Sequence, residues 1–142
     1  MSALAAPGLS AIRDSLRCPI CAGRLELTPG ALRCRQRHTF NIARHGYVSL
    51  LSGTNAISGD DAPMIQARER FLATGAYEPI RRAVSTMVSH TIPRDGIVLD
   101  VGCGTGYYLA GALDKVTGAR GLGLDSSVRA LRVAARVHER AA

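Results

Sequence analysis

The sequence predicts an α/β protein. A small zinc-ribbon-like β module comes first, followed by a helical hairpin and the first βαβα part of a Rossmann-like fold. Three observations predict it. Cysteine and histidine fall at metal-ligand spacing within residues 17–51, and apolar residues recur at helical spacing after residue 60. Two short apolar runs then flank a glycine turn and a helix between residues 97 and 125.

Length and composition limit the classes of protein. The chain has 142 residues, of which 46% are hydrophobic and 20% charged, as in a globular protein of about one domain. No apolar run approaches the roughly 18 residues of a membrane span. The first residues lack a basic segment followed by an apolar one, so no secretory signal is expected and a cytoplasmic location is the default.

Positive charge is concentrated near the N-terminus. The net charge is +7, and Lys115 is the single lysine among 18 cationic residues. Residues 13–46 hold seven arginines against two acids, Asp14 and Glu26, for a net charge of +5. This bias favours a polyanionic partner, above all nucleic acid. A GC-rich genome would explain arginine over lysine, but not the clustering of Arg13, Arg17, Arg24, Arg33, Arg35, Arg37 and Arg44.

The N-terminal third divides into three expected parts. Residues 1–16 are small and apolar and are expected to be a loose arm. Residues 17–51 contain short, weakly alternating runs around the cysteines, with a turn at Pro29-Gly30, and predict strands with little hydrophobic core of their own. Residues 52–59 predict a flexible linker.

Two helices are expected across residues 52–94, after that linker. Asp60 or Asp61 can cap the first helix, Pro63 suits its first turn, and Gly75 suits its end. Its apolar positions are Met64, Ala67, Phe71 and Leu72. The second helix carries an apolar stripe with the spacing of a buried face, formed by Ile80, Ala83, Val84, Met87 and Val88.

The C-terminal third, residues 95–142, predicts strand, turn, helix, strand and helix. Residues 97–101 (IVLDV) predict a buried strand, GCGTG a turn and YYLAGALDK a helix. GARGLGLD predicts a second strand. The last fifteen residues predict a helix with one arginine stripe, made of Arg129, Arg132, Arg136 and Arg140.

Cysteine spacing predicts a metal site. Cys18-x2-Cys21-x12-Cys34-x3-His38 offers three thiolates and an imidazole, the set that tetrahedral Zn²⁺ prefers. Four protein ligands leave no open position, so the zinc would be structural, and its binding would substitute for burial of a core. A disulfide or unbound thiols are the alternatives, and a cytoplasmic setting argues against disulfides. His45 and Cys103 are expected to lie outside the ligand set.

The second motif is a glycine turn. Gly102, Gly104 and Gly106 follow a predicted strand and open a helix, so that a ligand can approach the backbone. A dinucleotide fold would want its third glycine one residue later, at Tyr107, and no P-loop lysine follows. A strand, turn and helix without any ligand is the alternative.

Two carboxylates indicate which cofactor the turn serves. Asp100 ends the strand ahead of the glycines, which resembles the first motif of class I S-adenosylmethionine (SAM) methyltransferases, where this carboxylate orients the cationic methionine end. Asp125 ends the second strand, nineteen residues after Gly106, where a carboxylate can accept hydrogen bonds from ribose hydroxyls.

From residue 16 onward the chain resembles bacterial 23S ribosomal RNA guanine-N1 methyltransferases. The resemblance rests on four stretches: CPIC…CRQRHTFNIARHGYVSLL, GDDAPMIQARERFLATGAY, VLDVGCGTGYY and GLGLDSS. It implies a zinc-binding N-terminal domain that recognises a hairpin of 23S ribosomal RNA, and a domain that transfers methyl from SAM to N1 of a guanine. One branch of the family is linked to macrolide resistance of the tylosin kind.

The resemblance also implies residue roles. Cys18, Cys21, Cys34 and His38 match the family's zinc ligands. Gly104 and Thr105 match cofactor contacts in the turn, and Tyr77 matches a tyrosine that touches the cofactor, although simple packing of Tyr77 is the alternative. No residue is identified as a catalytic base for the N1 proton.

The family's proteins are much longer, and only two strands of the methyltransferase sheet are expected in this chain. It therefore looks like a truncated member: an interrupted gene, a fragment, or half of a split protein. The methyltransferase or its N-terminal part is the leading function, and a catalytically inactive zinc-ribbon RNA-binding fragment is the alternative. A complementing C-terminal half or a homodimer are the corresponding partners. A small-molecule methyltransferase with an incidental zinc knuckle is a third possibility, which the basic N-terminal segment disfavours.

Overall fold

The computed structural model describes residues 7–51 and 59–142. Residues 1–6 of the expected arm, and the expected linker except Gly59, lie outside the described residues. Within them, no helix is long and apolar enough to cross a bilayer. In chain order the elements are α1 (Pro7–Ile12), η1 (Arg13–Ser15), β1 (Glu26–Thr28), β2 (Ala31–Arg33), β3 (Thr39–Asn41), α2 (Ala62–Ala73), α3 (Glu78–Thr91), β4 (Ile97–Val101), α4 (Tyr107–Lys115), β5 (Arg120–Leu124) and α5 (Val128–Ala134).

The cysteine-bearing module is an antiparallel sheet in the order β1-β2-β3, with Leu32 opposite Leu27 on one side and Phe40 on the other. The expectation of a loose arm is wrong for residues 7–16. Leu9 and Ile12 of α1 are buried in one cluster with Leu32 and Phe40. The module therefore has a small apolar core after all, because this short N-terminal helix supplies part of it.

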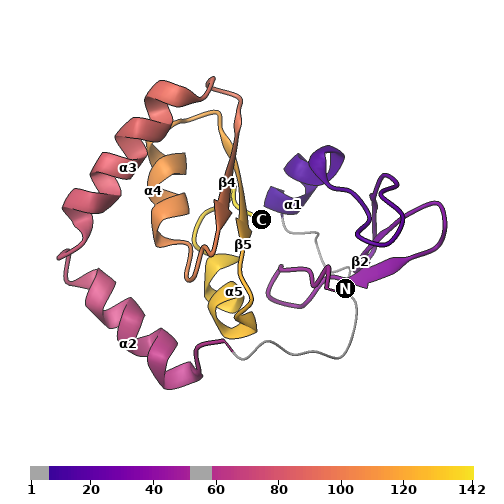
Figure 1. Ribbon diagram of the computed structural model, residues 1–142, viewed down its shortest axis with the longest axis horizontal. Coiled ribbons are helices and arrows are strands. Elements are labelled where there is room, and N and C mark those ends of the chain that lie inside the picture. The colour runs from indigo at the N-terminus through magenta and orange to yellow at the C-terminus, as the bar shows by residue number, and fades with distance from the viewer. Residues whose placement is uncertain (1–6, 52–58) are drawn as a thin grey trace.

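The two predicted helices are present, with the predicted signals at their ends. The Asp61 carboxylate caps α2 by accepting a hydrogen bond from the Met64 amide at 2.9 Å, and Pro63 lies in the first turn. Gly75, with φ +79°, lies between α2 and α3, in a conformation that favours glycine. Figure 1 shows the two helices as an outer arm of the molecule, with α3 beside α4.

The apolar stripe of α3 does not form the buried face that its spacing predicts. Met87 is 69% exposed, and Ile80 and Val84 are also exposed, while Val88 alone of the stripe packs against the core. The buried residue of α3 is Ser85, which lies against Gly111 of α4. A Cβ at Gly111 would stand 2.9 Å from the Ser85 Oγ. The close approach of the two helices therefore selects a small polar side chain at this crossing.

Arg81 joins α3 to α4 through several contacts. Its Nε donates to the Tyr107 carbonyl at 3.0 Å, its Nη2 lies 2.9 Å from the Asp114 carboxylate, and its guanidinium stacks 5.2 Å from the centre of the Tyr107 ring. The side chain is 23% exposed. A partly buried arginine with these bonds contributes more than a surface ion pair does.

Arg81→Ala should lower the free energy of unfolding by about 1–3 kcal/mol, because a partly buried acceptor and a carboxylate lose their donor. Arg82→Ala is the matched control. Arg82 is the next residue on α3, 77% exposed, and pairs only with Glu78 among the described contacts. Its loss should cost about 0.5 kcal/mol or less. Urea denaturation followed by circular dichroism measures both, and equal losses would contradict this role of Arg81.

The predicted strand–turn–helix–strand unit is confirmed. β4 and β5 pair in parallel with Leu99 opposite Leu122, and α4 connects them. Residues 140–142 form an isolated parallel bridge beside β5 that the sequence did not predict. The amides of Gly121 and Gly123 donate to the carbonyls of Arg140 and Ala142, and the Ala142 amide donates back to Gly121.

The predicted C-terminal helix is shorter than expected. α5 ends at Ala134, so Arg140 does not continue an arginine stripe. Its guanidinium instead donates to the carbonyls of Leu113, Val116 and Ala119 at and beyond the end of α4. A cation at these unpaired carbonyls satisfies groups that the helix leaves without partners, and this explains why the chain turns inward.

One face of the small parallel sheet is partly exposed, although Leu122 of β5 on that face packs against the core of the module. Leu99 is 55% and Val101 76% exposed, and Leu124 beside them is also accessible. The side chains that alternate with them face α4, where Gly121 and Gly123 leave room for Leu109 and Leu113. Parallel sheets are ordinarily covered on both faces. Leu99, Val101 and Leu124 therefore form an uncovered apolar area on this sheet.

Candidate functional site

Two knuckles bring the metal ligands together. In the first, the Ala22 amide donates to the Cys18 carbonyl at 2.8 Å; in the second, the Arg37 amide donates to the Cys34 carbonyl at 2.9 Å. Ala22 and Arg37 both have positive φ, +57° and +67°, which is uncommon for residues other than glycine. The module therefore holds two strained turns at the places where the ligand pairs are presented.

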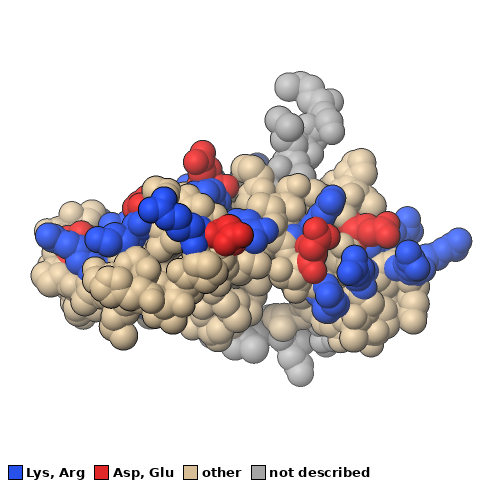
Figure 2. Space-filling view, turned by 90° about the horizontal axis from the view of Figure 1, so that it is seen from above, with Lys and Arg blue, Asp and Glu red and all other residues tan. Residues whose placement is uncertain are grey.

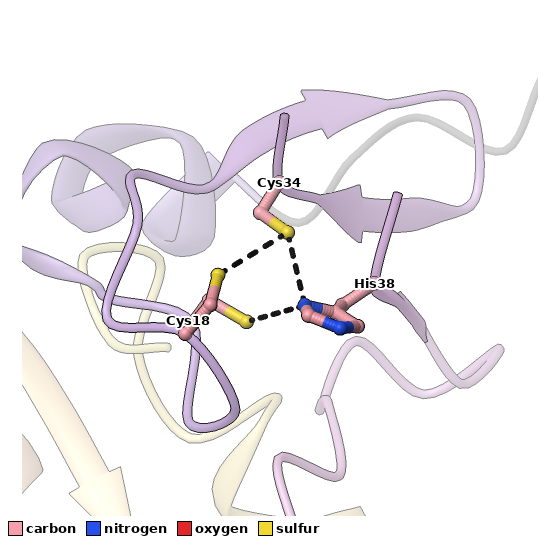
Figure 3. A group of neighbouring side chains, drawn as sticks. Cys18, Cys34 and His38 are labelled. Carbon is pink, nitrogen blue, oxygen red and sulfur yellow. Dashed lines mark hydrogen bonds between the residues drawn. The ribbon is translucent and has the colours of Figure 1, made fainter. Parts of the chain in front are cut away.

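The donor atoms have the separations that a tetrahedral zinc site requires. The four lie within 4.8 Å of one another, with the Cys21 and Cys34 sulfurs 3.7 Å apart. The His38 Nδ1 is 3.5 Å from the Cys18 sulfur and 3.4 Å from the Cys34 sulfur, and Figure 3 shows these side chains converging. Zn–S and Zn–N bonds of about 2.3 and 2.0–2.1 Å place ligands about 3.8 and 3.6 Å apart.

The electrostatics also suit a metal-binding thiolate. Burial acts to raise the pKa of the Cys18 thiol. Hydrogen bonds from the backbone amides of Cys21 and Ile20, and from the side chains of Cys21 and His38, lower it by more. The pKa of Cys18 therefore falls to about 6. Zinc binds the thiolate form. The donor set, its separations and this environment fit a structural Zn²⁺ with four protein ligands, as predicted.

His45 and Cys103 lie outside the cluster of metal ligands, as predicted. Burial and the positive charges of Arg44, Arg136 and Arg132 lower the pKa of His45. Burial and the negative charges of Asp100 and Asp125 raise the pKa of Cys103 to about 12. Cys103 is therefore a protonated, buried thiol in the glycine turn at neutral pH.

The glycine turn is open on one side and packed on the other. Gly102, Gly104 and Gly106 all have positive φ. Apart from chain neighbours, no heavy atom of residues 7–51 or 59–142 lies within 4 Å of the position of a Gly102 Cβ, so a ligand could approach the backbone there. A Cβ at Gly106 would instead stand 2.7 Å from Val137. Gly106 is therefore required by packing, whereas Gly102 leaves space. Thr105 is buried in the turn.

Asp100 and Asp125 lie close together beside this turn. Burial, and then the negative charge of Asp125, raise the pKa of Asp100. The Asp125 carboxylate accepts hydrogen bonds from the Gly104 amide at 2.8 Å and the Ser127 amide at 2.7 Å. Each oxygen has a second lone pair for another donor. Two carboxylates beside an open glycine turn favour a ligand with cationic and hydroxyl groups.

A hollow adjoins the turn. It has a volume of about 540 Å³ and lies between the module and the C-terminal part of the parallel sheet. Gly102 and Asp125 lie on its wall, and most other lining side chains are apolar, among them Leu50, Leu122 and Leu131. This volume is within the usual range for small-molecule sites, about 300–1,000 Å³.

Tyr77 lies at the start of α3. Its ring packs edge-on against Phe71 at 5.1 Å between centroids and is 41% exposed. This packing lies within the helical hairpin, between α2 and the start of α3, and not between the hairpin and the sheet. A contact between Tyr77 and a cofactor stays a prediction.

The seven arginines of the basic segment all lie on the surface. Figure 2 shows cationic side chains on the module and on the helical part, with acidic ones between them. Arg13, Arg17, Arg24 and Arg35 line a polar hollow of about 400 Å³, together with Asp14 and Glu26. The sequence indicated the charge, but the gathering of these four arginines comes from the fold of α1, η1 and the first knuckle.

Comparison with known proteins matches the N-terminal part of the chain to one family and most of the chain to curated relatives. A zinc-ribbon family described as "RlmA, N-terminal" matches residues 16–55. A Micromonospora griseorubida protein named as a 23S rRNA (guanine-N(1)-)-methyltransferase is 47% identical over 144 residues, which cover 89% of this chain and 49% of that protein. The 23S rRNA (guanine(748)-N(1))-methyltransferase of Streptomyces fradiae is 41% identical, over 89% of this chain and 46% of that protein.

A third relative, YxjB of Bacillus subtilis strain 168, is also named as a 23S rRNA (guanine-N(1)-)-methyltransferase. It is 36% identical over 100 residues, which cover 66% of this chain and 34% of that protein. The chain thus spans about half the length of the first two curated relatives and a third of the last.

Proposed function

Because the chain belongs to the family of bacterial 23S rRNA (guanine-N1)-methyltransferases, we propose that it supplies the zinc module and the cofactor turn of an enzyme that methylates N1 of a guanine in a hairpin of 23S rRNA. The observation that carries the proposal is the open glycine turn bordered by Asp100 and Asp125, in the same chain as the zinc ribbon. The site of action would be the cytoplasm.

The described residues fit SAM. The cofactor carries its methyl group on a positively charged sulfur, and this supplies the chemical activation. Asp100 would orient the cationic methionine end. Asp125 would accept from the ribose hydroxyls, while the apolar hollow beside Gly102 has room for a nucleoside. Gly104, Thr105, Gly106 and Tyr77 complete the proposed contacts. We assign no catalytic base among the described residues.

The 142-residue chain should bind S-adenosylhomocysteine in isothermal titration calorimetry, and NAD⁺ should not compete. Asp100→Asn should weaken binding by about 10-fold or more, because a charge-assisted hydrogen bond contributes about 1.5–3 kcal/mol. This variant keeps the shape of the side chain. Absence of binding at millimolar ligand, in protein that retains its helical circular dichroism, would contradict the cofactor assignment.

We further propose that residues 17–51, with α1 and η1, form the RNA-binding module. The four arginines around the polar hollow would contact phosphates. An RNA-binding zinc ribbon without catalysis is the second candidate function, which the exposed face of the parallel sheet favours. The basic surface serves both candidates, so RNA binding tests the module and methyl transfer separates the two.

Replacing Arg24 and Arg35 together with glutamine should weaken binding of a 23S rRNA hairpin. The slope of log affinity against log salt should fall by up to about 2, because each phosphate that is no longer neutralised accounts for about one unit. Arg70→Gln with Arg94→Gln removes the same charge outside the module and should leave the slope nearly unchanged. Fluorescence anisotropy at several salt concentrations measures the slopes. Equal effects of both double variants would show that net charge alone acts.

A further inference from the structure

Arg68 of α2 reaches over the glycine turn. Its Nη1 lies 3.8 Å from the position that a Cβ would take at Gly104, and the side chain is 46% exposed. The helix that carries it comes from the outer arm of the molecule, far from the turn in the sequence. A guanidinium from a separate element thus lies beside the part of the turn that the Asp125 carboxylate holds.

Asp60 holds this arginine in place. The Asp60 Oδ2 lies 2.6 Å from the Arg68 Nη1. Asp60 is in turn fixed close to Ser127, which follows β5. The Ser127 hydroxyl donates to the Asp60 carbonyl at 3.5 Å. The backbone of the preceding residue, Gly59, is so close that a Cβ there would stand 2.6 Å from the Ser127 Cβ. The Ser127 amide also donates to Asp125. Arg68 and Asp125 are therefore positioned by one continuous set of contacts.

The charges around the turn are mostly negative, which is unfavourable for a ligand that carries a carboxylate. Asp60, Asp100 and Asp125 all lie near it, and the methionine end of SAM bears a carboxylate as well as an ammonium group. The acids suit the ammonium but repel the carboxylate. A guanidinium has five N–H donors in a planar fork that matches a carboxylate, and the contact with Asp60 engages one end of it.

We propose that Arg68 binds the methionine carboxylate of the cofactor, with Asp60 as its positioning residue. This inference rests on the proposed cofactor site and extends it to a residue outside the glycine motif. It makes α2 part of the site. It also gives a reason why the segment from Asp60 to Arg68 packs against the ends of the parallel strands.

Two ligands that differ in the methionine end test this proposal. S-adenosylhomocysteine carries the carboxylate, whereas 5′-methylthioadenosine keeps the adenosine and the thioether without it. Arg68→Gln should weaken binding of S-adenosylhomocysteine by at least about 10-fold in calorimetry and change the affinity for 5′-methylthioadenosine less than about twofold. Arg68→Lys, which keeps the charge without the fork, should retain an intermediate affinity.

Arg70→Gln is the matched control, because Arg70 is an exposed arginine of the same helix, and it should bind both ligands like the wild-type chain. Asp60→Asn should reduce affinity for S-adenosylhomocysteine alone. If Arg68→Gln binds that ligand normally, or weakens both ligands equally, the inference fails while the cofactor site stands. If the wild-type chain binds neither ligand, the proposed cofactor site fails, and the inference with it.

Discussion

Cys34→Ser should release the zinc ion and unfold the β1–β3 module, and this is the largest loss of stability that we expect from a single substitution. Structural Zn²⁺ contributes about 10–16 kcal/mol of apparent binding energy in small zinc modules. The apolar core of the module is too small to replace that, and the knuckles at Ala22 and Arg37 hold positive φ values that cost energy. The wild-type chain should contain one equivalent of Zn²⁺.

Cys103→Ser is the matched control for this experiment, since Cys103 is the fourth cysteine and lies outside the metal cluster. It should keep one equivalent of zinc. Elemental analysis measures the metal, and hydrogen exchange of the β1–β3 amides measures the folding of the module. The amides of α4 should stay protected in both variants, because α4 packs chiefly on α3 and not on the module.

A thiol reagent gives a second readout. In the wild-type protein the three zinc-ligating thiols should react only after the metal is removed by a chelator. The fourth thiol, Cys103, should stay unreactive, because it is buried and its pKa of about 12 keeps it protonated. Zinc content well below half an equivalent in protein purified with a reductant would contradict the assignment. So would an unchanged zinc content in the Cys34→Ser variant.

The features that could be predicted from sequence are those that depend on a few adjacent residues. The ligand spacing around Cys18 and Cys34 gave the metal site because each knuckle is a local turn. The apolar run at 97–101, the glycine turn and the following helix have the predicted bounds for the same reason. The Asp61 cap lies within one turn of the residue it serves.

The features that could not be predicted depend on contacts between distant segments. Nothing near Leu9 and Ile12 indicates that their helix completes the core of the module. The inward face of α3 carries Ser85 because Gly111, on another helix, allows close approach. Arg140 leaves the expected helix to bind carbonyls of α4. In the candidate site, the same applies to Arg68, whose neighbours Asp60 and Gly104 lie in separate segments.

The 142-residue chain alone should transfer no detectable methyl to 23S rRNA from a strain that lacks the modification. The turn, Asp100 and Asp125 form one wall of the proposed site, and the exposed Leu99 and Val101 show that the opposite face of the sheet is uncovered. Displacement of a reacting group by even 1 Å can cost on the order of 100-fold in rate. Among the described residues we assign none to a guanine pocket, so this part of the site gives the guanine no fixed geometry.

The full-length Micromonospora relative is the positive control, because it is twice as long and shares 47% of aligned residues. Its second half, expressed separately and added to this chain, should restore transfer of labelled methyl by covering the exposed face of β4 and β5. Restoration that is lost in Leu99→Asp, a substitution on that face outside the hollow, would show that docking on the sheet is what matters. Met87→Asp is the matched control, since Met87 is similarly exposed but belongs to α3.

Each outcome separates the candidate functions. Robust turnover by the 142-residue chain without a partner would contradict the argument from the exposed sheet. It would show that β4, β5 and the glycine turn are sufficient for methyl transfer. If transfer stays absent with the added half while RNA binding persists, the zinc-ribbon RNA-binding function is the one supported. Sedimentation of the chain alone tests whether it forms a homodimer. A second copy that covered the same apolar face would compete with the added half, so the restored activity would then depend on the concentration of the chain.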